Sequence, residues 1–489
     1  MRAEDVARRH QFRDGMTLVD FGEVGLPVFR LTLDAITMAH KSMPTIQEFV
    51  LRALSLDETT EAGIARMLGL KDEIVAASIN ALVSDGYVAR QLSPGLEPAF
   101  KLTDAGELRL TQEREEVPQD EMLVIDYDAI RRIPFRLTGE SVVRASELAA
   151  SGSIQIRPYP ADAPAIEELN LLEVSKVIRK RSGEDFRRTV LALKRTARRN
   201  NVFREAVALV YAGNRSGEVQ VSFAIDGTIS DAHERAFAEH GGPRKMGFLR
   251  AVAEAESKRA LERLVGKPIM RLFPNPLEIA AARQEEAEAV EELAAIRPIA
   301  ERVSGRARRT DPSVAALTAA EERLQVAKFG LDAFEVRPLA CFEVADLLDE
   351  AIENARSSLI VTTAGVQGVI VNGFRLRAID RMVASGVRLE VESLWDHRTE
   401  PEGAQFDPMA ELGRRAARGA LSLRKGTRSR FYFLIQDDEL AVISSRPFLG
   451  EMSKRTGFTR VEGLVTRKPE LVGEIRTLAI GTAVPVSNG

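Results

Sequence analysis

Contact with phosphate is the chemistry that the sequence suggests most strongly, because its cations gather in residues 179–199. We expect a helix from about Gly183 in which Phe186, Val190 and Leu193 form an apolar stripe and the cations cover the remaining surface. Such a face suits nucleic-acid phosphates, but it also suits an acidic protein partner or solvent alone. The predicted nucleic-acid-binding residues are Arg179, Lys180, Arg181, Arg187, Arg188, Lys194, Arg195, Arg198 and Arg199.

A second polar group, Arg430, Tyr432, Asp437 and Ser445, is spaced along two apolar, strand-like runs near the end of the chain. The guanidinium of Arg430 stays protonated and therefore cannot act as a nucleophile. It could still hold a phosphate through a bidentate contact. The alternative is that Arg430 and Tyr432 only line the surface of a domain retained as a scaffold.

The elements around this group follow the order of a known domain. A helical pattern at Glu343–Ala355 precedes the strand Leu359–Ala364, and then come the strand Gly386–Val391 and the closing element Lys468–Val472. In this order, residues 336–480 resemble a phospholipase D-like domain of the kind appended to bacterial regulatory and conflict-associated proteins. The resemblance covers under a third of the chain and implies an α/β fold.

The resemblance also implies what this domain has lost. The family motif H-x-K-x4-D-x6-G-S aligns with Arg430, Tyr432, Asp437 and Ser445, so only the Asp and the Ser remain. In active members the His is the nucleophile and the Lys stabilises charge on the phosphate. Active members also pair two such motifs, and this sequence has no second one. The resemblance therefore implies a pseudoenzyme without catalytic residues.

Residues 44–112 carry three helical patterns followed by a hairpin pattern. Thr60 can cap the second helix and Gly69 can end it. Leu82–Val88 and Leu102–Gly106 match the spacing "L-x-x-x-G-x-V... L-T-x-x-G" of the winged helices of bacterial regulators, which the segment resembles. The side chains expected to face its core are Ile46, Phe49, Val50, Ala53, Ile64, Met67, Leu68, Ile74, Ala77 and Leu82.

The third of these helices, expected at Asp72–Asp85, would read bases in a DNA-binding member. Its expected exposed residues include Glu73, Ser78 and Asn80, and Lys71 is the only cation near its start. The major groove repels an anionic helix. The sequence therefore favours packing, dimerisation or contact through the wing over base reading by this helix.

Other candidate sites are weaker. His233 and His240 lie seven residues apart on one face of an expected helix, but two ligands without a nearby Cys or further His do not make a metal site. Cys341 lies among apolar residues, which favours a buried thiol. The sequence has no phosphate-binding loop, nucleophile elbow or paired-cysteine motif. We therefore expect no metal and no cofactor.

These motifs suggest a multi-domain chain of mixed α/β (α+β) class. The predicted segments are an N-terminal arm (1–43), the winged helix (44–112), a central mixed α/β domain (123–270), a helical arm (271–335) and the phospholipase D-like domain (336–480). Residues 113–123 are acidic and contain Pro118, as a linker would. The helix expected at 277–294 is interrupted at Arg297-Pro298.

The 489 residues carry a formal net charge of -4, so any electrostatic partner must meet a local patch rather than the whole surface. No apolar stretch approaches the roughly 20 residues that span a bilayer. There is no apolar signal core at the start. We expect a soluble cytoplasmic protein without membrane contact.

The preferred hypothesis is a non-catalytic nucleic-acid-associated or adaptor subunit of a bacterial multi-component system. Antiphage defence enters through family association alone. A protein partner, such as an ATPase or a nuclease, would supply any catalysis. Two alternatives remain: an atypical phospholipase D-like nuclease or phosphodiesterase, and a winged-helix transcriptional regulator.

Overall fold

The structure is a computed structural model that describes residues 2–41, 43–91, 98–111, 115–137, 142–182, 189–213, 218–248, 254–303, 311–393, 406–426, 429–450 and 458–482. The chain divides into two compact units, Met1–Pro27 with Glu140–Ala161 and Val202–Gly489 (unit 1), and Val28–Gly139 with Asp162–Asn201 (unit 2). Its helices and sheets confirm the mixed α/β, multi-domain class. None of the described helices is long and apolar enough to cross a membrane.

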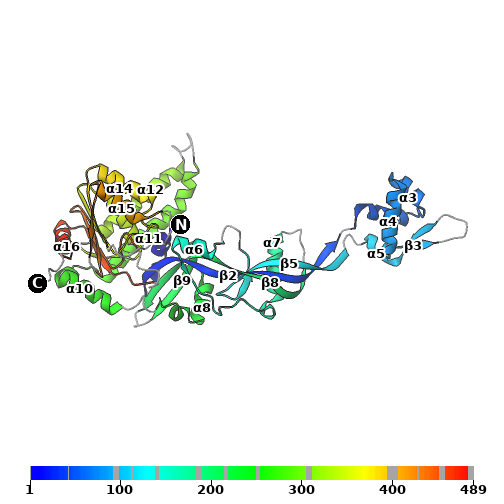
Figure 1. Cartoon of the computed structure of the whole chain (residues 1–489), viewed down its shortest axis with the longest axis horizontal. Helices are drawn as coiled ribbons and strands as arrows, with labels where there is room; N and C mark the ends of the chain where they lie inside the picture. Colours follow the sequence, from blue (N-terminus) through cyan, green and yellow to red (C-terminus); the bar gives the residue numbers. More distant parts are fainter. Residues whose placement is uncertain are drawn as a thin grey trace. The chain divides into compact units, whose positions relative to one another are not determined.

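The C-terminal part of unit 1 is built around a seven-stranded sheet of order β11-β17-β16-β15-β12-β13-β14 (Figure 1). Strands β12, β13 and β14 run parallel, whereas β15, β16, β17 and β11 pair antiparallel with their neighbours. Four of the seven strands, β12, β13, β15 and β16, fall where apolar runs predict them. The bounds are β11 Arg337–Pro338, β12 Ser358–Thr363, β13 Arg388–Ser393, β14 Ser422–Lys425, β15 Tyr432–Gln436, β16 Leu440–Ser444 and β17 Gly463–Thr466.

Helices cover both faces of this sheet, because successive strand residues point to opposite sides. Leu434 packs with Leu348 on one face, and its neighbour Phe433 packs with Val265 on the other. The first face is covered by α13 (Glu343–Asn354), α14 (Gly373–Ala384) and α15 (Pro408–Ala417), and the second by α10 (Glu254–Met270) and α16 (Pro469–Thr482).

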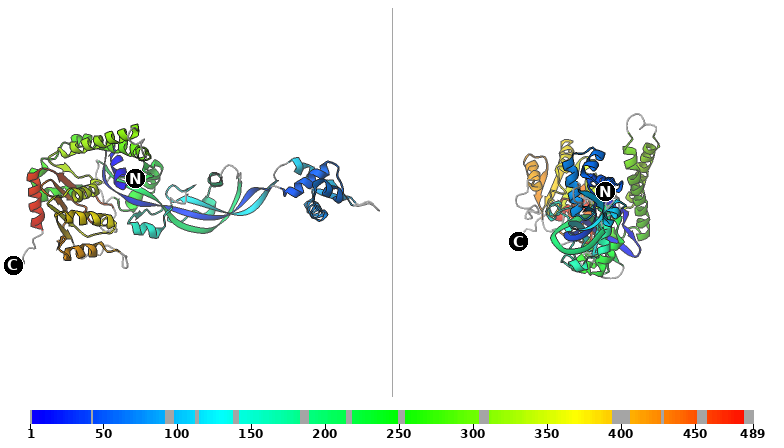
Figure 2. Two further views of the ribbon diagram at one scale, coloured as in Figure 1. Left: turned by 90° about the horizontal axis from the view of Figure 1, so that it is seen from above. Right: turned by 90° about the vertical axis from the view of Figure 1, so that its right-hand side faces the viewer.

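Two long helices, α11 (Pro276–Glu301) and α12 (Pro312–Asp332), run side by side in unit 1 (Figure 2). The predicted interruption at Arg297-Pro298 is wrong, because α11 continues through Pro298 to its end. A proline near a helix end removes only one backbone hydrogen bond, which packing against the second helix can offset.

The remaining elements of unit 1 include a second sheet. In it, β8 (Thr189–Gly213) and β9 pair antiparallel. The bounds are α1 Ala3–Arg9, β1 Phe12–Arg13, α6 Ala145–Ser151, β7 Ile154–Gln155, β9 Val219–Ile225, β10 Thr228–Ile229, α8 Asp231–Glu239 and α9 Gly242–Lys245.

Unit 2 contains long paired strands where the sequence suggests an arm and a linker. β2 runs from Met16 to Lys41, and its part in unit 2 pairs antiparallel with β5 (Glu115–Asp128). The prediction of an acidic linker is therefore wrong from Glu115 onward. The hydrogen bonds between β2 and β5 outweigh the low strand propensity of Glu and Asp. β6 (Ile133–Phe135) extends this sheet, and α7 (Leu171–Ser182) and the short 3-10 helix η2 (Ile166–Glu168) pack on its core.

The helix expected from Gly183 to Arg199 is also wrong. Residues 183–188 lie outside the described residues, and Thr189–Gly213 forms the strand β8, which neighbours β2 in the sheet. Val190 and Leu193 satisfy a helical spacing, yet in the structure they pack into the apolar core of unit 2. The β-branched pair Thr189-Val190 suits a strand better than a helix.

Residues 45–111 form three helices, a two-stranded hairpin and a fourth helix. Thr60 accepts a hydrogen bond from the Gly63 N–H and Gly69 adopts the left-handed conformation, as predicted for the second helix. Ile46, Phe49, Met67, Ile74 and Ala77 are exposed, so their predicted inward orientation is wrong. The bounds are α2 Thr45–Ser55, α3 Glu61–Leu68, α4 Asp72–Ser84, β3 Val88–Gln91, β4 Ala99–Leu102 and α5 Asp104–Thr111.

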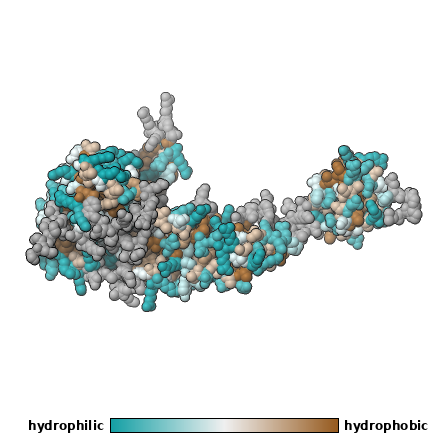
Figure 3. Space-filling model, in the orientation of Figure 1, coloured by the Kyte–Doolittle hydropathy of each residue, from teal (hydrophilic) through white to brown (hydrophobic). Residues whose placement is uncertain are grey.

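The core of this module explains the difference. Val75, Ile79 and Leu82 form the buried stripe of α4, one position out of phase with the predicted stripe at its start. The predicted and observed stripes share Leu82, so helical spacing alone does not separate them. The residues wrongly predicted to face the core are mostly apolar and lie on the surface. Figure 3 shows brown, hydrophobic areas on the surface of the module formed by α2–α5.

Gly106, the last residue of the Leu102–Gly106 pattern, is fixed by a backbone contact. A Cβ there would lie 2.2 Å from the carbonyl oxygen of Tyr87, whereas Gly86 has a φ of +77° and open space around it. We expect Gly106→Ala to lower the free energy of unfolding by about 1–3 kcal/mol through overpacking. Gly86→Ala should cost about 1 kcal/mol through backbone strain alone. Urea unfolding of the full chain measures both, and a Gly106→Ala variant as stable as the wild type would contradict the contact.

Candidate nucleic-acid interface and phosphodiesterase-like site

The structure divides the predicted basic residues between two elements. Arg179, Lys180 and Arg181 belong to the last turn of α7, and Arg187 and Arg188 lie outside the described residues. The remaining four, Lys194, Arg195, Arg198 and Arg199, are exposed on β8. The candidate interface is therefore the strand segment 194–199, which we call the basic segment of β8.

Two cations of this segment carry ion pairs with acidic residues of unit 2. Lys194 Nζ lies 2.5 Å from an Asp120 carboxylate oxygen, and Arg195 Nε lies 2.6 Å from one of Asp34. Exposed pairs of this kind contribute about 0–1 kcal/mol, so a phosphate can displace the carboxylates at small cost. Within the part of the chain that the structure describes, Arg198 and Arg199 form no ion pair. A phosphate can therefore meet these two arginines without displacing a carboxylate of the described residues.

The helix α4 presents the charge that its sequence predicts. Asp72, Glu73 and Asp85 are exposed, together with Lys71 at the start of the helix. The hairpin offers two exposed cations, Arg90 and Lys101, and the Arg90 guanidinium lies 5.5 Å from the Phe100 ring centroid. In this module, contact with phosphate is therefore better placed on the hairpin than on α4.

Three of the four polar residues singled out near the end of the chain lie at one edge of the seven-stranded sheet. Because β12, β13, β14 and β16 run in the same direction, their carboxyl ends lie at this edge, where the antiparallel β15 begins. Tyr432 opens β15 opposite Ser444 at the end of β16. Arg430, Tyr432 and Ser445 therefore lie near the carboxyl edge, where ligand sites of α/β sheets form.

Asp437 does not join them. It follows the last residue of β15, so it lies at the opposite edge, about 17 Å from Tyr432 by the rise of a strand. Its carboxylate accepts the N–H groups of Arg356, Ser357 and Ser358 at 2.7–2.8 Å. Burial alone would raise the pKa of Asp437, but these hydrogen bonds and one from the Ser357 hydroxyl hold it below its usual range. This carboxylate anchors the start of β12.

The three residues at the carboxyl edge form no nucleophile and base. Tyr432 is only 7% exposed, and burial raises the pKa of its hydroxyl. The Ser445 hydroxyl accepts the Glu462 N–H at 2.9 Å and lies 3.4 Å from the Arg460 carbonyl oxygen. Arg430 is exposed. Its guanidinium can hold an anion but cannot attack one.

A cavity of about 380 Å³ lies beside this edge, within unit 1. The segments that follow β12 and β16 contribute to its walls, including Ile370, Arg446 and Phe448. These two segments are joined by a 2.9 Å hydrogen bond from the Gln367 N–H to the Leu449 carbonyl oxygen.

Asp20 of β2 lines the same cavity and is only 2% exposed. Its carboxylate forms an ion pair with Arg446 and accepts the N–H groups of Phe21 and Thr459, each at 2.8 Å. The sequence gives no sign of this contact, because it joins residues 426 positions apart.

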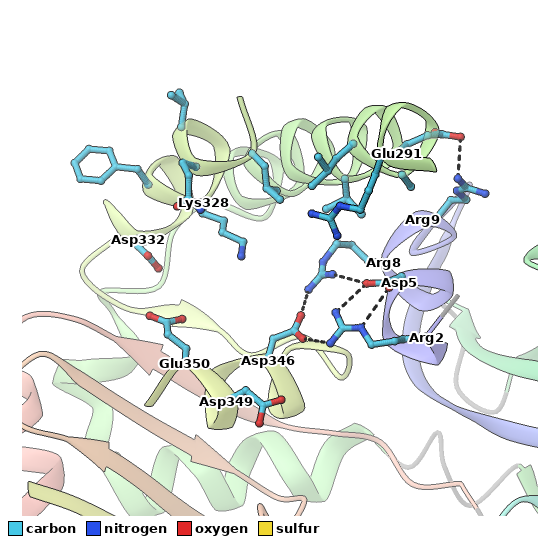
Figure 4. Close-up of a pocket in the computed structure, with 18 of the residues that line it drawn as sticks. Arg2, Asp5, Arg8, Arg9, Glu291, Lys328, Asp332, Asp346, Asp349 and Glu350 are labelled. Atoms are coloured by element: carbon cyan, nitrogen blue, oxygen red, sulfur yellow. Dashed lines mark hydrogen bonds and ion pairs between the residues drawn. The ribbon is translucent and has the colours of Figure 1, made fainter. Parts of the chain in front are cut away.

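A larger cavity, of about 1020 Å³, lies between α1, α11, α12 and α13 (Figure 4). Asp346 binds Arg2 and Arg8 at 2.9 and 2.6 Å on its floor. Lys328 extends into the cavity in Figure 4, and Phe329 beside it is 77% exposed. Acidic and basic side chains are mixed throughout this lining, so its charge selects neither an anion nor a cation.

The histidines and the cysteine have structural surroundings. His233 is buried, and its Nδ1 lies 2.7 Å from the Ser230 hydroxyl. Among the described residues no group of three or more His, Cys, Asp or Glu side chains could hold a metal ion. Cys341 is buried as expected, and burial raises the pKa of its thiol to about 12.

Comparison with known proteins gives partial likenesses. No protein-family model and no curated protein matches this sequence. One similar solved structure is TrmBL2, an archaeal chromatin protein with a novel mode of DNA binding, which is 16% identical with a TM-score of 0.23. The match covers 35% of this chain and 62% of TrmBL2, so this chain spans less than two thirds of the length of that protein.

Two further solved structures are also similar over part of the chain. NucT from Helicobacter pylori is 14% identical with a TM-score of 0.22, and the match covers 30% of this chain and 96% of that one. Nuc from Salmonella typhimurium, a phospholipase D family member, is 16% identical with a TM-score of 0.22 and coverages of 28% and 84%. The chain is thus similar over about a third of its length to phospholipase D family members and to a DNA-binding chromatin protein.

Proposed function

We propose that this chain is a non-catalytic, nucleic-acid-associated or adaptor subunit of a bacterial multi-component system in the cytoplasm, with antiphage defence as the candidate pathway. In this proposal residues 44–112 are a winged helix and residues 336–480 a degenerate phospholipase D-like domain. A partner protein, an ATPase or a nuclease, supplies the catalysis. The five segments predicted from the sequence remain its working division into domains.

The observation that carries the nucleic-acid part is the basic segment of β8. Four of its six residues are exposed cations, and two of these, Arg198 and Arg199, form no ion pair among the described residues. Because successive residues of a strand point to opposite faces, the four cations are divided between the two faces of β8. Cations on either face can neutralise phosphates of a nucleic acid. Releasing the counterions from those phosphates supplies the affinity and makes it depend on salt.

The surroundings of the motif residues support the non-catalytic part. A phosphoryl transfer through a covalent intermediate needs a nucleophile with a free electron pair. Arg430 has none to offer, Tyr432 is buried, and Ser445 is held by the backbone of Glu462. Asp437 cannot act as their base because it lies at the other edge of the sheet.

The adaptor part rests on the surface of the 44–112 module. Ile46 and Phe49 on α2, Met67 on α3 and Ile74 on α4 are all exposed. Large apolar side chains on several helices of one small module are typical of surfaces that meet another protein. The acidic residues of α4 would oppose a duplex at the same surface.

An alanine double variant tests the nucleic-acid part. We expect Arg198→Ala/Arg199→Ala to weaken binding of a labelled oligonucleotide about a hundredfold or more, because each of the two charge-assisted contacts contributes about 1.5–3 kcal/mol. The dependence of log K on log salt should become shallower by about 1.4 for a single strand, or 1.8 for a duplex. Fluorescence anisotropy at several salt concentrations measures both quantities.

A matched control removes the same charge elsewhere. Arg377 and Arg381 are exposed one turn apart on α14 of unit 1, so Arg377→Ala/Arg381→Ala changes the net charge equally. This control should retain the affinity and the salt dependence of the wild type. Equal weakening by both double variants would assign the effect to net charge and reject the basic segment as the interface.

A further inference from the structure

Tyr159 stands apart from the other four tyrosines of the chain. It is 51% exposed, whereas Tyr127, Tyr211 and Tyr432 are buried and Tyr87 is half-buried. It lies in unit 1 between Pro158 and Pro160, whose rings fix the backbone φ on both sides. An aromatic ring held at the surface in this way loses little conformational freedom when a ligand stacks on it.

Two basic side chains flank the ring. The Lys245 ammonium lies 3.0 Å from the ring centroid of Tyr159. The His240 ring lies 5.6 Å away, tilted by 52°. Both residues follow α8, which is anchored from beneath by Phe237, packed edge-on against Phe223 and Phe248 at 5.1 and 6.0 Å. The cluster is therefore held on a packed element.

Further cations lie along the same segments. Arg157 precedes Tyr159 by two positions, and Arg235 and Arg244 belong to α8 and α9. All three are exposed and carry no ion pair within the described parts of the chain. From Asp231 to Phe248 the sequence contains three acidic residues, Asp231, Glu234 and Glu239, and Glu234 is ion-paired with Arg13. The cations near Tyr159 in the sequence and on these segments thus outnumber the two carboxylates of α8 that carry no ion pair among the described residues.

An aromatic and cationic surface of this kind matches the two parts of a nucleotide. The base can stack on an aromatic ring, and its phosphate is attracted to neighbouring cations. A base inside a duplex is already stacked on both sides, so the ring can reach only an unpaired base. A cation–π contact between Lys245 and Tyr159 that served stability alone would require neither the half-exposed ring nor the further cations.

We propose that Tyr159, His240 and Lys245 form a stacking site for an unpaired base of single-stranded nucleic acid, with Lys245 and Arg244 holding the adjacent phosphates. This inference rests on the proposed nucleic-acid function and adds to it the class of ligand. The base stacks on the exposed part of the Tyr159 ring. The site lies in unit 1 and is separate in sequence from the basic segment of β8.

Substitutions at Tyr159 separate stacking from charge. With a labelled oligo-dT of about 16 nucleotides, Tyr159→Leu is expected to weaken binding about fivefold or more, because stacking contributes about 1–3 kcal/mol per base. Its salt dependence should match the wild type, since no charge is removed. Tyr159→Phe should bind as the wild type does. Lys245→Ala should instead make the salt dependence shallower by about 0.7.

The controls distinguish this inference from the proposed function. Tyr159→Leu should leave binding of a duplex unchanged, and Phe374→Leu, at an exposed aromatic residue of α14, should leave binding of oligo-dT unchanged. Full oligo-dT affinity in Tyr159→Leu would overturn the stacking site, even where Arg198→Ala/Arg199→Ala abolishes binding and the proposed function holds. A wild-type chain that binds no nucleic acid would overturn both.

Discussion

Replacing Glu343 with alanine is expected to lower the free energy of unfolding by about 3–5 kcal/mol, the usual cost of breaking a buried ion pair from one side. Glu343 begins α13 and is 5% exposed. Its carboxylate lies 2.7 Å from the guanidinium of Arg337 and accepts the Ala340 N–H at 2.7 Å. The variant leaves the buried Arg337 charge without this partner, and Arg283 nearby loses the same carboxylate at 3.9 Å.

Urea unfolding of the full chain measures the loss, and an exposed pair supplies the control. Asp380 binds Arg415 at 2.7 Å, but half of its side chain is in solvent. Asp380→Ala should therefore cost about 0–1 kcal/mol. Equal losses in Glu343→Ala and Asp380→Ala would contradict the buried network.

The same residue sets the direction of a pH effect. Burial alone would raise the pKa of Glu343, but Arg337 and Arg283 outweigh it and hold the pKa below its usual range. The stabilisation that ionised Glu343 contributes is therefore complete above the pKa of a glutamate in the unfolded chain, about 4.3. It is lost as the pH falls through the pKa of Glu343 in the folded protein. Below pH of about 4.3, unfolding curves of Glu343→Ala should converge on those of the wild type.

Asp20→Ala is expected to lower the free energy of unfolding by about 2–3 kcal/mol, because buried hydrogen-bond donors lose their acceptor. The carboxylate receives the N–H groups of Phe21 and Thr459 and the guanidinium of Arg446 beside the smaller cavity of unit 1. Asp20→Asn keeps an acceptor for one N–H group and should lose less. Equal losses in the two variants would contradict the assigned hydrogen bonds.

The pH dependence of Asp20 has the opposite sign. Burial raises the pKa of Asp20, and Arg446 and the two N–H groups offset only part of that rise. The folded state thus keeps a proton that the unfolded state has released. The stabilisation from this bound proton is complete below the pKa of an aspartate in the unfolded chain, about 3.9. It is lost as the pH rises through the pKa of Asp20 in the folded protein. In Asp20→Asn, which carries no titrating carboxyl at this position, stability should not fall in this way as the pH rises. Urea unfolding at a series of pH values measures the difference.

Strands β12, β13, β15 and β16 of the C-terminal sheet could be predicted because each is a short apolar run between turn residues, which β11 and β14 are not. Gly386 releases the chain into β13, and β15 and β16 are separated by Asp437-Asp438-Glu439. Their burial on both faces explains the continuous apolar pattern. Position and type of these elements follow from local sequence alone.

The long strands β2 and β8 were harder to predict, although β2 carries a signal. Phe29, Leu31, Leu33 and Ala35 alternate with less buried residues, which is the period-two pattern of a strand with one buried face. That alternation could have identified β2. In the basic segment of β8 the pattern is lost among cations, and only pairing with a neighbouring strand determines its conformation.

The candidate sites were predictable only in part. The basic residues and the altered motif are visible in the sequence, because both are local patterns. The separation of Asp437 from Tyr432 follows only once β15 is placed as a strand between them. The contacts of Asp20 with Arg446 and of Tyr159 with Lys245 join distant positions, so no local spacing indicates them.

The proposal of non-catalytic nucleic-acid binding can be tested in one assay. Equilibrium binding of the purified chain to labelled single-stranded and duplex oligonucleotides is measured at several salt concentrations. The length of the oligonucleotide in the same samples shows whether it is cut. We expect binding that weakens steeply as the salt concentration rises and that depends on Arg198 and Arg199. The oligonucleotide should remain uncut. Salt-independent binding, no binding, or cleavage that Ser445→Ala or Asp437→Ala abolishes would contradict the proposal.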